Sequence, residues 1–137
     1  MRLNSYLIFD GKAEAAFNFY AQALHGKIAM LMRFGEAPGA GNTPAETRDW
    51  IMHVRLEVGD QVLMASDCPP DRPYHGIHGC SVSIAVDTVA EGERIFKALA
   101  EGGTIQMPFE QTFWAERFGM VVDRFGVSWM VNCEKGQ

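Results

Sequence analysis

The chain has 137 residues, 47% of them hydrophobic and 21% charged, which suits one compact domain with a buried core. A net charge of −5 without any run of Lys or Arg argues against nucleic acid and anionic membranes as partners, because both attract clustered positive charge. The sequence has no stretch of about 20 apolar residues and no signal-peptide pattern. Its three cysteines have unrelated spacings, so we expect a cytoplasmic protein with reduced thiols.

The first half of the chain predicts one strand, one helix and three further strands. A β-prone run at 3–9 ends at the turn signal Asp10-Gly11, and apolar residues then recur at helical spacing over 12–24. The remaining strands are expected at 27–34, 50–58 and 61–66, with a loop or mobile flap at 35–48 and a Pro-, Gly- and His-rich stretch at 68–78.

The same order then starts again. A strand at 80–86 precedes a helix at 88–101, in which Thr88 and Glu91 have the spacing of a capping box. Three strands are expected after it, at 104–113, 118–123 and 127–132. Asp123 and Arg124, before Gly126, are expected to set the last hairpin turn and could do so as an ion pair.

A strand, a helix and three strands, given twice, indicate duplication within a single domain, 1–137. Module one is expected at about 1–68, a linker at about 69–78 and module two at about 79–133. The predicted fold class is α+β: two βαβββ modules whose curved mixed sheets enclose a cavity, with the helices outside.

Six stretches resemble the vicinal oxygen chelate superfamily, which includes glyoxalase I, bleomycin-resistance proteins and extradiol dioxygenases. They are Tyr6–Gly11, Ala16–Tyr20, Met52-His53, Leu63–Asp67, Leu99–Gly103 and Thr112–Asn132. The sequences of these stretches are most similar to the PhnB-like branch, labelled 3-demethylubiquinone 3-methyltransferase-like. The resemblance implies the glyoxalase/bleomycin-resistance/dioxygenase fold and a homodimer. No cofactor is expected, because no glycine-rich strand-to-helix turn is present to hold a nucleotide-like group.

The resemblance also implies where a metal would bind. In the superfamily's metalloenzymes the ligands are His, Gln or Glu side chains on the first and last strand of each module. Here Met130 and Met64 fall at the last strands, Ser81 falls near the start of module two, and residues 3–6 are the candidates in module one. Thioethers and hydroxyls are poor ligands for a hard divalent metal, so we expect no metal at the standard place.

His53, Arg55 and Glu57 share one face of the strand at 50–58. If that face lines the cavity, His53 and Glu57 are candidates for acid–base catalysis and Arg55 for binding an anion. If the face is turned to solvent or to a dimer partner, the three form a solvated charged ladder. The sequence leaves both alternatives open.

A further set of residues is expected to line the cavity and bind a small molecule. Aromatic, thioether and small polar side chains suit a planar or apolar ligand. With Arg55, the expected ligand-binding residues are Tyr6, Met64, Ser81, Trp114, Trp129, Met130 and Asn132.

Two functions follow from these features. The first is a metal-free protein that binds a small molecule, as bleomycin-resistance relatives do. The alternative is a metal-dependent or acid–base enzyme of the same superfamily, of the lyase or dioxygenase type. The absent metal ligands favour the first function, and the polar face with His53 keeps the second open.

Overall fold

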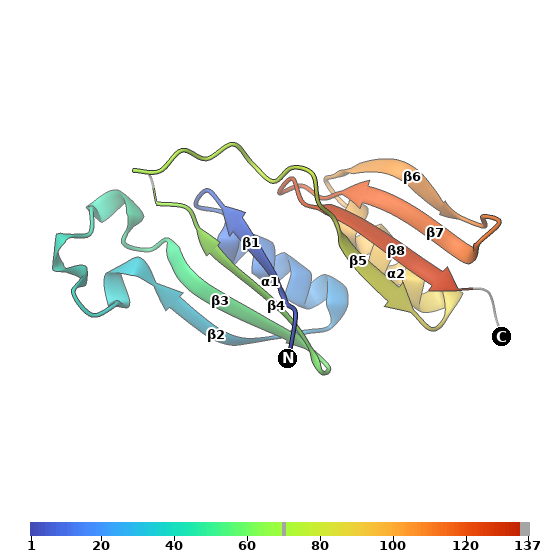
Figure 1. Cartoon of the computed structure of the whole chain (residues 1–137), viewed down its shortest axis with the longest axis horizontal. Coiled ribbons are helices and arrows are strands. Elements are labelled where there is room, and N and C mark those ends of the chain that lie inside the picture. Colours follow the sequence, from blue (N-terminus) through green and yellow to red (C-terminus); the bar gives the residue numbers. More distant parts are fainter. Residues whose placement is uncertain (70, 135–137) are drawn as a thin grey trace. The chain divides into compact units, whose positions relative to one another are not determined.

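The computed structural model describes residues 1–69 and 71–134, and the chain forms two compact units that divide between Ile77 and His78 (Figure 1). Each unit contains one four-stranded mixed sheet and one α-helix. The predicted α+β class with two βαβββ modules is confirmed. Neither helix in the described part of the chain is long and apolar enough to cross a membrane.

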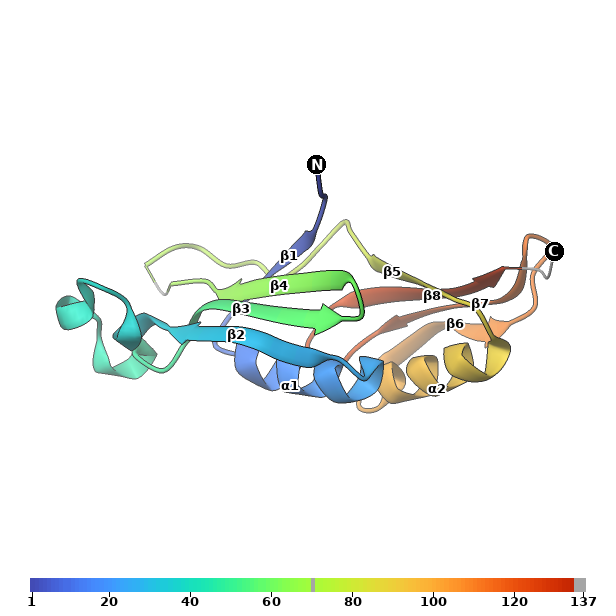
Figure 2. The same ribbon diagram turned by 90° about the horizontal axis from the view of Figure 1, so that it is seen from below.

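The first unit is built from β1 (Ser5–Phe9), α1 (Ala13–Leu24), β2 (Lys27–Arg33), β3 (Ile51–Val58) and β4 (Gln61–Asp67). Its strand order is β1-β4-β3-β2, in which β1 runs parallel to β4 and the other neighbours are antiparallel. The helix α1 covers one face of this sheet (Figure 2).

The core of the first unit lies between α1 and the covered face. Alternate residues of a strand point to opposite faces, and Val54 and Leu56 of β3 and Leu63, Ala65 and Asp67 of β4 are accordingly buried. The helix contributes the buried side chains of Ala16, Phe17 and Tyr20. The sheet contributes Leu7, Phe9, Val54, Leu56, Leu63 and Ala65.

The second unit repeats this arrangement with β5 (Val82–Val86), α2 (Val89–Ala100), β6 (Thr104–Glu110), β7 (Ala115–Val122) and β8 (Ser128–Glu134). Its strand order is β5-β8-β7-β6, with β5 parallel to β8. Thr88 caps α2 as predicted, because its Oγ1 accepts a hydrogen bond of 3.1 Å from the backbone N–H of Glu91. The core beneath α2 contains Ile95, Phe96, Leu99, Val121, Trp129, Val131 and Cys133.

Two segments differ from the sequence-based expectation. The strand expected to end at 113 ends at Glu110, and the next begins at Ala115 rather than 118, because Thr112 and Ala115 exchange hydrogen bonds that form a turn there. The expected flap is folded into three short 3₁₀ turns, η1 (Phe34–Glu36), η2 (Ala40–Asn42) and η3 (Ala45–Thr47). These turns form a compact loop.

Candidate functional site

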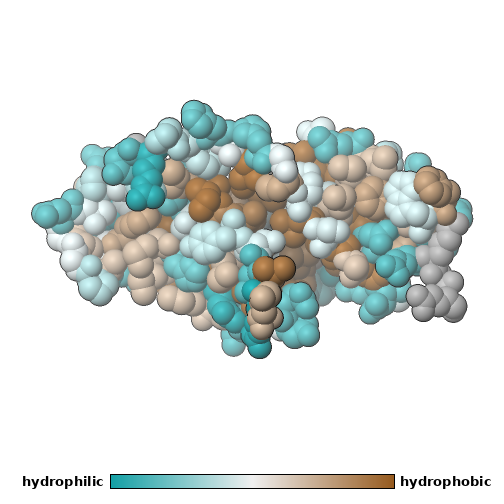
Figure 3. Space-filling model, viewed as in Figure 1, coloured by the Kyte–Doolittle hydropathy of each residue, from teal (hydrophilic) through white to brown (hydrophobic). Residues whose placement is uncertain are grey.

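The sheet of the first unit has a face that α1 does not cover. Residues directly opposite one another on neighbouring strands project to the same side, so the register of the sheet identifies the side chains on this face. We call this set open face 1, and its members are Tyr6, Ile8, Met30, Met32, His53, Arg55, Glu57, Met64 and Ser66. Figure 3 looks onto this side of the sheet and shows apolar and polar side chains mixed on it.

His53, Arg55 and Glu57 therefore lie on the side of β3 that faces away from the helix. All three are only partly buried, whereas Val54 and Leu56 on the other side are fully buried. The alternation read from the sequence is confirmed for this strand.

Tyr6 and His53 form the closest polar contact on open face 1. The Tyr6 hydroxyl lies 3.0 Å from Nδ1 of His53, and the two rings stack with centroids 5.7 Å apart and planes inclined by 25°. Tyr6 belongs to β1 and His53 to β3, so the Tyr6 side chain crosses the intervening β4 beside Met64, its register partner. A phenol and an imidazole in contact can exchange a proton or fix a tautomer.

Arg55 and Glu57 form a second polar pair. The guanidinium contacts the Glu57 carboxylate at 3.3 Å, and both side chains are more than a third exposed. His53 and Glu57 are four residues apart on one strand, which separates their Cα atoms by roughly 13 Å. The structure therefore does not bring the two expected acid–base residues together, and it gives His53 the partner Tyr6 instead.

The second unit has a corresponding uncovered face on its sheet, which we call open face 2. By register it carries Ser83, Ala85, Phe118, Met120, Met130 and Asn132. Met130 is flanked by Ser83 and Met120, and the Oδ1 atom of Asn132 is buried without a hydrogen-bond partner in the described part of the chain. Ser81 lies just before β5, where its hydroxyl oxygen is 2.8 Å from that of Ser128, and the register partner of Met130 is Ser83.

The two tryptophans expected in the ligand set lie in different surroundings. Trp114 is 49% exposed and stacks edge-on between Phe113 and Phe118, with centroids 4.8 and 5.5 Å away. Trp129 is 1% exposed, lies on the face covered by α2 and donates its indole N–H to the Asp123 carboxylate at 2.8 Å. Trp114 is accessible to a ligand, whereas Trp129 is a core residue.

Asp123 sets the last hairpin turn as predicted. Its Oδ1 accepts hydrogen bonds from the backbone N–H groups of Phe125 and Val127, at 2.8 and 3.1 Å. Arg124, which follows Asp123 in this turn, contacts the Glu101 carboxylate at 3.8 Å.

The donors at the superfamily's ligand positions do not fit a hard divalent metal. On open face 1, Met64 lies beside Tyr6, and on open face 2, Met130 lies beside Ser83. Thioether sulfur and neutral hydroxyl groups bind such ions weakly. Among residues 1–69 and 71–134, no three His, Cys, Asp or Glu side chains gather closely enough to hold a metal ion.

Asp67 is a structural residue that the sequence analysis missed. Its carboxylate is 1% exposed and accepts hydrogen bonds from the N–H groups of Ala13 and Ile51, at 3.0 and 2.8 Å. It thereby joins the start of α1 and the start of β3 to the end of β4. The available signal was its position two residues after Ala65, on the buried side of an alternating strand, where an aspartate needs internal donors.

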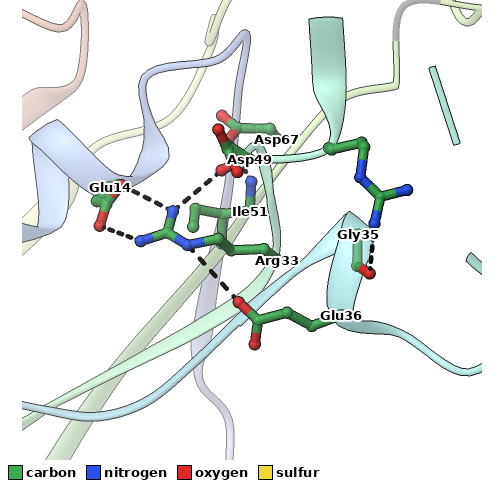
Figure 4. A network of polar contacts seen from close by, with 8 residues as sticks. Glu14, Arg33, Gly35, Glu36, Asp49, Ile51 and Asp67 are labelled. Carbon is green, nitrogen blue, oxygen red and sulfur yellow. Dashed lines mark hydrogen bonds and ion pairs between the residues drawn. The ribbon is translucent and has the colours of Figure 1, made fainter. Parts of the chain in front are cut away.

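Arg33 and Glu14 form a bidentate ion pair at the edge of the same region (Figure 4). The two hydrogen bonds are 2.9 and 2.8 Å long, and Arg33 also donates to the carbonyl oxygen of Asp49. The hydrogen bond from Arg33 lowers the pKa of Glu14, with its positive charge adding to the effect and partial burial opposing it. This pair fastens β2 to α1.

Comparison with known proteins gives a family match over nearly the whole chain. Residues 1–132 match the family described as 3-demethylubiquinone-9 3-methyltransferase. The protein YjdN of Escherichia coli K12 is 33% identical over 100% of this chain and 98% of its own length.

Solved structures agree with this match. Protein PA1353 from Pseudomonas aeruginosa is 53% identical, with a TM-score of 0.91 over 99% of both chains. The PhnB protein from Bacillus cereus is 25% identical, with a TM-score of 0.81 over 97% of this chain and 99% of its own. The fosfomycin resistance protein FosX from Mesorhizobium loti, at 11% identity and a TM-score of 0.58 over 98% and 92% of the two chains, shares the fold.

Proposed function

Because the chain belongs to the 3-demethylubiquinone-9 3-methyltransferase family, the PhnB-like branch of the vicinal oxygen chelate superfamily, we propose that it binds a small, partly apolar molecule without a resident metal. Open face 1 carries the proposal. It combines thioether and aliphatic side chains with a few polar groups at fixed places, and this combination is typical of small-molecule sites.

The polar groups of open face 1 suit a ligand with a hydrogen-bond acceptor or a negative charge. Arg55, which also contacts the Glu57 carboxylate at 3.3 Å, places its guanidinium beside Met30 and Met64, its register partners on the two neighbouring strands. His53 offers a ring nitrogen, because Tyr6 occupies only Nδ1. An apolar body would then lie on the methionines while its polar end contacts His53 or Arg55.

The proposal without a metal rests on the kind of donors present at the superfamily's ligand positions. The decisive measurement is the metal content of protein purified without an affinity tag or chelator, read by elemental mass spectrometry. We expect far less than one Mn, Fe, Ni or Zn per chain, and no uptake after incubation with these ions. About one metal per chain would contradict the proposal and direct the search for ligands to His53.

Binding itself is tested by a ligand-detected NMR screen of small carboxylates and their methyl esters. We expect hits whose affinity falls when Arg55 is replaced by Gln, whereas the matched control Arg124→Gln, which lies in the second unit's hairpin turn, leaves them unchanged. If the esters bind as well as the acids, Arg55 has no part in the site.

An acid–base enzyme is a second candidate, favoured by the 3.0 Å contact between Tyr6 and His53. A paired imidazole on an accessible face can take up or give a proton in a bound substrate. In that case the His53→Ala variant loses turnover and the Tyr6→Phe variant loses part of it, with a changed pH–rate profile. Turnover that persists in His53→Ala would remove this candidate.

The family's description names a methyltransferase, and we do not extend that activity to this chain. The turns that lead from β1 into α1 and from β5 into α2 are short, and neither has the glycine-rich sequence that cradles a nucleotide-like methyl donor.

We further propose that the protein is a homodimer in the cytoplasm. Large apolar side chains such as Ile105, Met107 and Phe113 are exposed in the chain taken alone, and a second copy would cover some of them. The three cysteines are free, which suits a reducing compartment. Light scattering coupled to size exclusion should give twice the mass of the chain, and the monomer mass would contradict the dimer.

A further inference from the structure

The first unit also contains a pocket that lies outside open face 1. Its volume is about 630 Å³, within the range of small-molecule sites. It is lined by the compact loop that follows β2 and by Pro69 and Asp71, which follow β4. None of its lining residues belongs to open face 1, so its occupant can be tested separately from the proposed function.

The loop that forms one wall is held in place by its own hydrogen bonds. Arg48 donates to the carbonyl oxygens of Gly35 and Ala40, at 3.2 and 3.5 Å, so a single guanidinium joins the first two 3₁₀ turns. Thr47 is buried and donates its hydroxyl to the carbonyl oxygen of Pro44. Figure 4 shows the start of this loop beside the Arg33 pair, with Gly35 labelled. This wall of the pocket is therefore preformed in the protein without a ligand.

Several backbone donors of the lining are missing or already engaged, and acceptors are present. Pro44 and Pro69 have no N–H group, and the N–H groups of Phe34, Thr43 and Thr47 already donate to backbone carbonyls. The carboxylate of Asp71 and the carboxamide oxygen of Asn42 remain as acceptors.

In the loop that lines the pocket, acidic residues also outnumber basic ones. Asp71 is the one ionisable side chain among the described residues that line the pocket, and no ion pair engages it in the described part of the chain. The adjoining segment 34–49 contains three acidic residues and one basic residue, Arg48, whose guanidinium is engaged by the two carbonyl oxygens.

The apolar part of the lining is provided by Phe34, Pro44 and Pro69. The face of an aromatic ring attracts a cation, and proline rings give apolar contact without competing donors. A pocket with an aromatic ring and one carboxylate as its single ionisable side chain favours a positively charged organic group over an anion.

From these features we propose that the pocket binds a compact organic cation, of the alkylamine or quaternary ammonium class. Its charge is balanced by Asp71, and its alkyl groups contact Phe34, Pro44 and Pro69.

The test compares choline with 3,3-dimethyl-1-butanol, which has the same shape without the charge. Each is titrated into the full-length protein and followed by amide NMR, with sodium chloride added to match ionic strength. We expect choline to shift the amides of residues 39–43, 45–47 and 71, and the neutral alcohol to bind at least about fivefold more weakly.

Two variants locate the charge recognition. The Asp71→Asn variant should weaken choline binding by about fivefold, and Phe34→Leu by a similar factor. The Asp60→Asn variant, which removes the same charge at the exposed β3–β4 turn, should leave binding unchanged. The amide spectrum of each variant shows whether its fold is intact.

Equal binding of choline and the alcohol would overturn the proposal, as would equal effects of Asp71→Asn and Asp60→Asn. Shifts confined to open face 1, or no shift with either compound, would also overturn it. None of these results bears on the carboxylate screen against Arg55. The proposal for this pocket and the proposal for open face 1 are therefore tested independently.

Discussion

The hydroxyl of Tyr6 lies 3.0 Å from Nδ1 of His53, although the two residues are 47 positions apart in the chain. A phenol is a better hydrogen-bond donor than a neutral imidazole, and the imidazole nitrogen is the better acceptor. We therefore expect Tyr6 to donate and His53 to carry its proton on Nε2. The pair then presents an N–H donor on open face 1.

Replacing Tyr6 by Phe tests this tautomer assignment. The imidazole nitrogen shifts of His53, measured by long-range ¹H–¹⁵N NMR above pH 7.5, should report the Nε2–H tautomer in the wild type and a mixture in the Tyr6→Phe variant. Tyr74→Phe is the matched control, because the Tyr74 hydroxyl donates to the carbonyl oxygen of Ile8 instead. A mixture already present in the wild type would contradict the assignment.

Replacing Asp67 by Ala should destabilise the first unit strongly. The change leaves the buried N–H groups of Ala13 and Ile51 without acceptors, at a cost of roughly 2–5 kcal/mol in the free energy of unfolding. Urea denaturation measures the loss. Asp60→Ala at the exposed β3–β4 turn should change stability by no more than about 0.5 kcal/mol. Similar losses in the two variants would show that the Asp67 contacts contribute little.

Replacing each of the two tryptophans should lower the stability of the protein to a different extent. Trp129→Phe should cost about 2–4 kcal/mol, because it shrinks a buried side chain and leaves Asp123 without its indole donor. Trp114→Ala should change stability much less, because about half of that side chain is exposed. Thermal unfolding of both variants gives the comparison. A larger loss for Trp114→Ala would contradict the core assignment of Trp129.

The Glu14–Arg33 pair should make stability depend on acid pH. The pKa of Glu14 is lowered in the folded state, chiefly by the hydrogen bond from Arg33, so the pair contributes fully above the unfolded-state pKa of Glu14. Its contribution is lost as the pH falls through the folded-state pKa. The stability difference between the wild type and Glu14→Gln should therefore be larger at pH 7 than at pH 3. A pH-independent difference for Glu14→Gln would refute the assignment.

The order and type of the elements could be predicted from the sequence, because they depend on local signals. Apolar residues at helical spacing marked α1 and α2, alternation marked β3, and glycine turns marked the hairpins. Thr88 at the start of α2 and Asp123 in the last turn were identified for the same reason, since their partners lie within a few residues.

The candidate site could be predicted only in part. Alternation placed His53, Arg55 and Glu57 on one face, but it could not say whether that face lines a cavity or is turned to solvent or to a dimer partner. Residue type also placed Trp129 beside Trp114 in the ligand set, whereas Trp129 is buried on the covered face of the sheet and Trp114 lies half exposed in the turn before β7.

Sequence by itself determined the duplicated α+β fold and the family. Tertiary structure decided which side chains meet: Tyr6 with His53, Asp67 with Ala13 and Ile51, and Glu14 with Arg33. The physical reason is that these contacts join residues 16 to 54 positions apart, and their existence depends on strand order and register. Strand order and register arise from packing the whole unit, which no short stretch of sequence encodes.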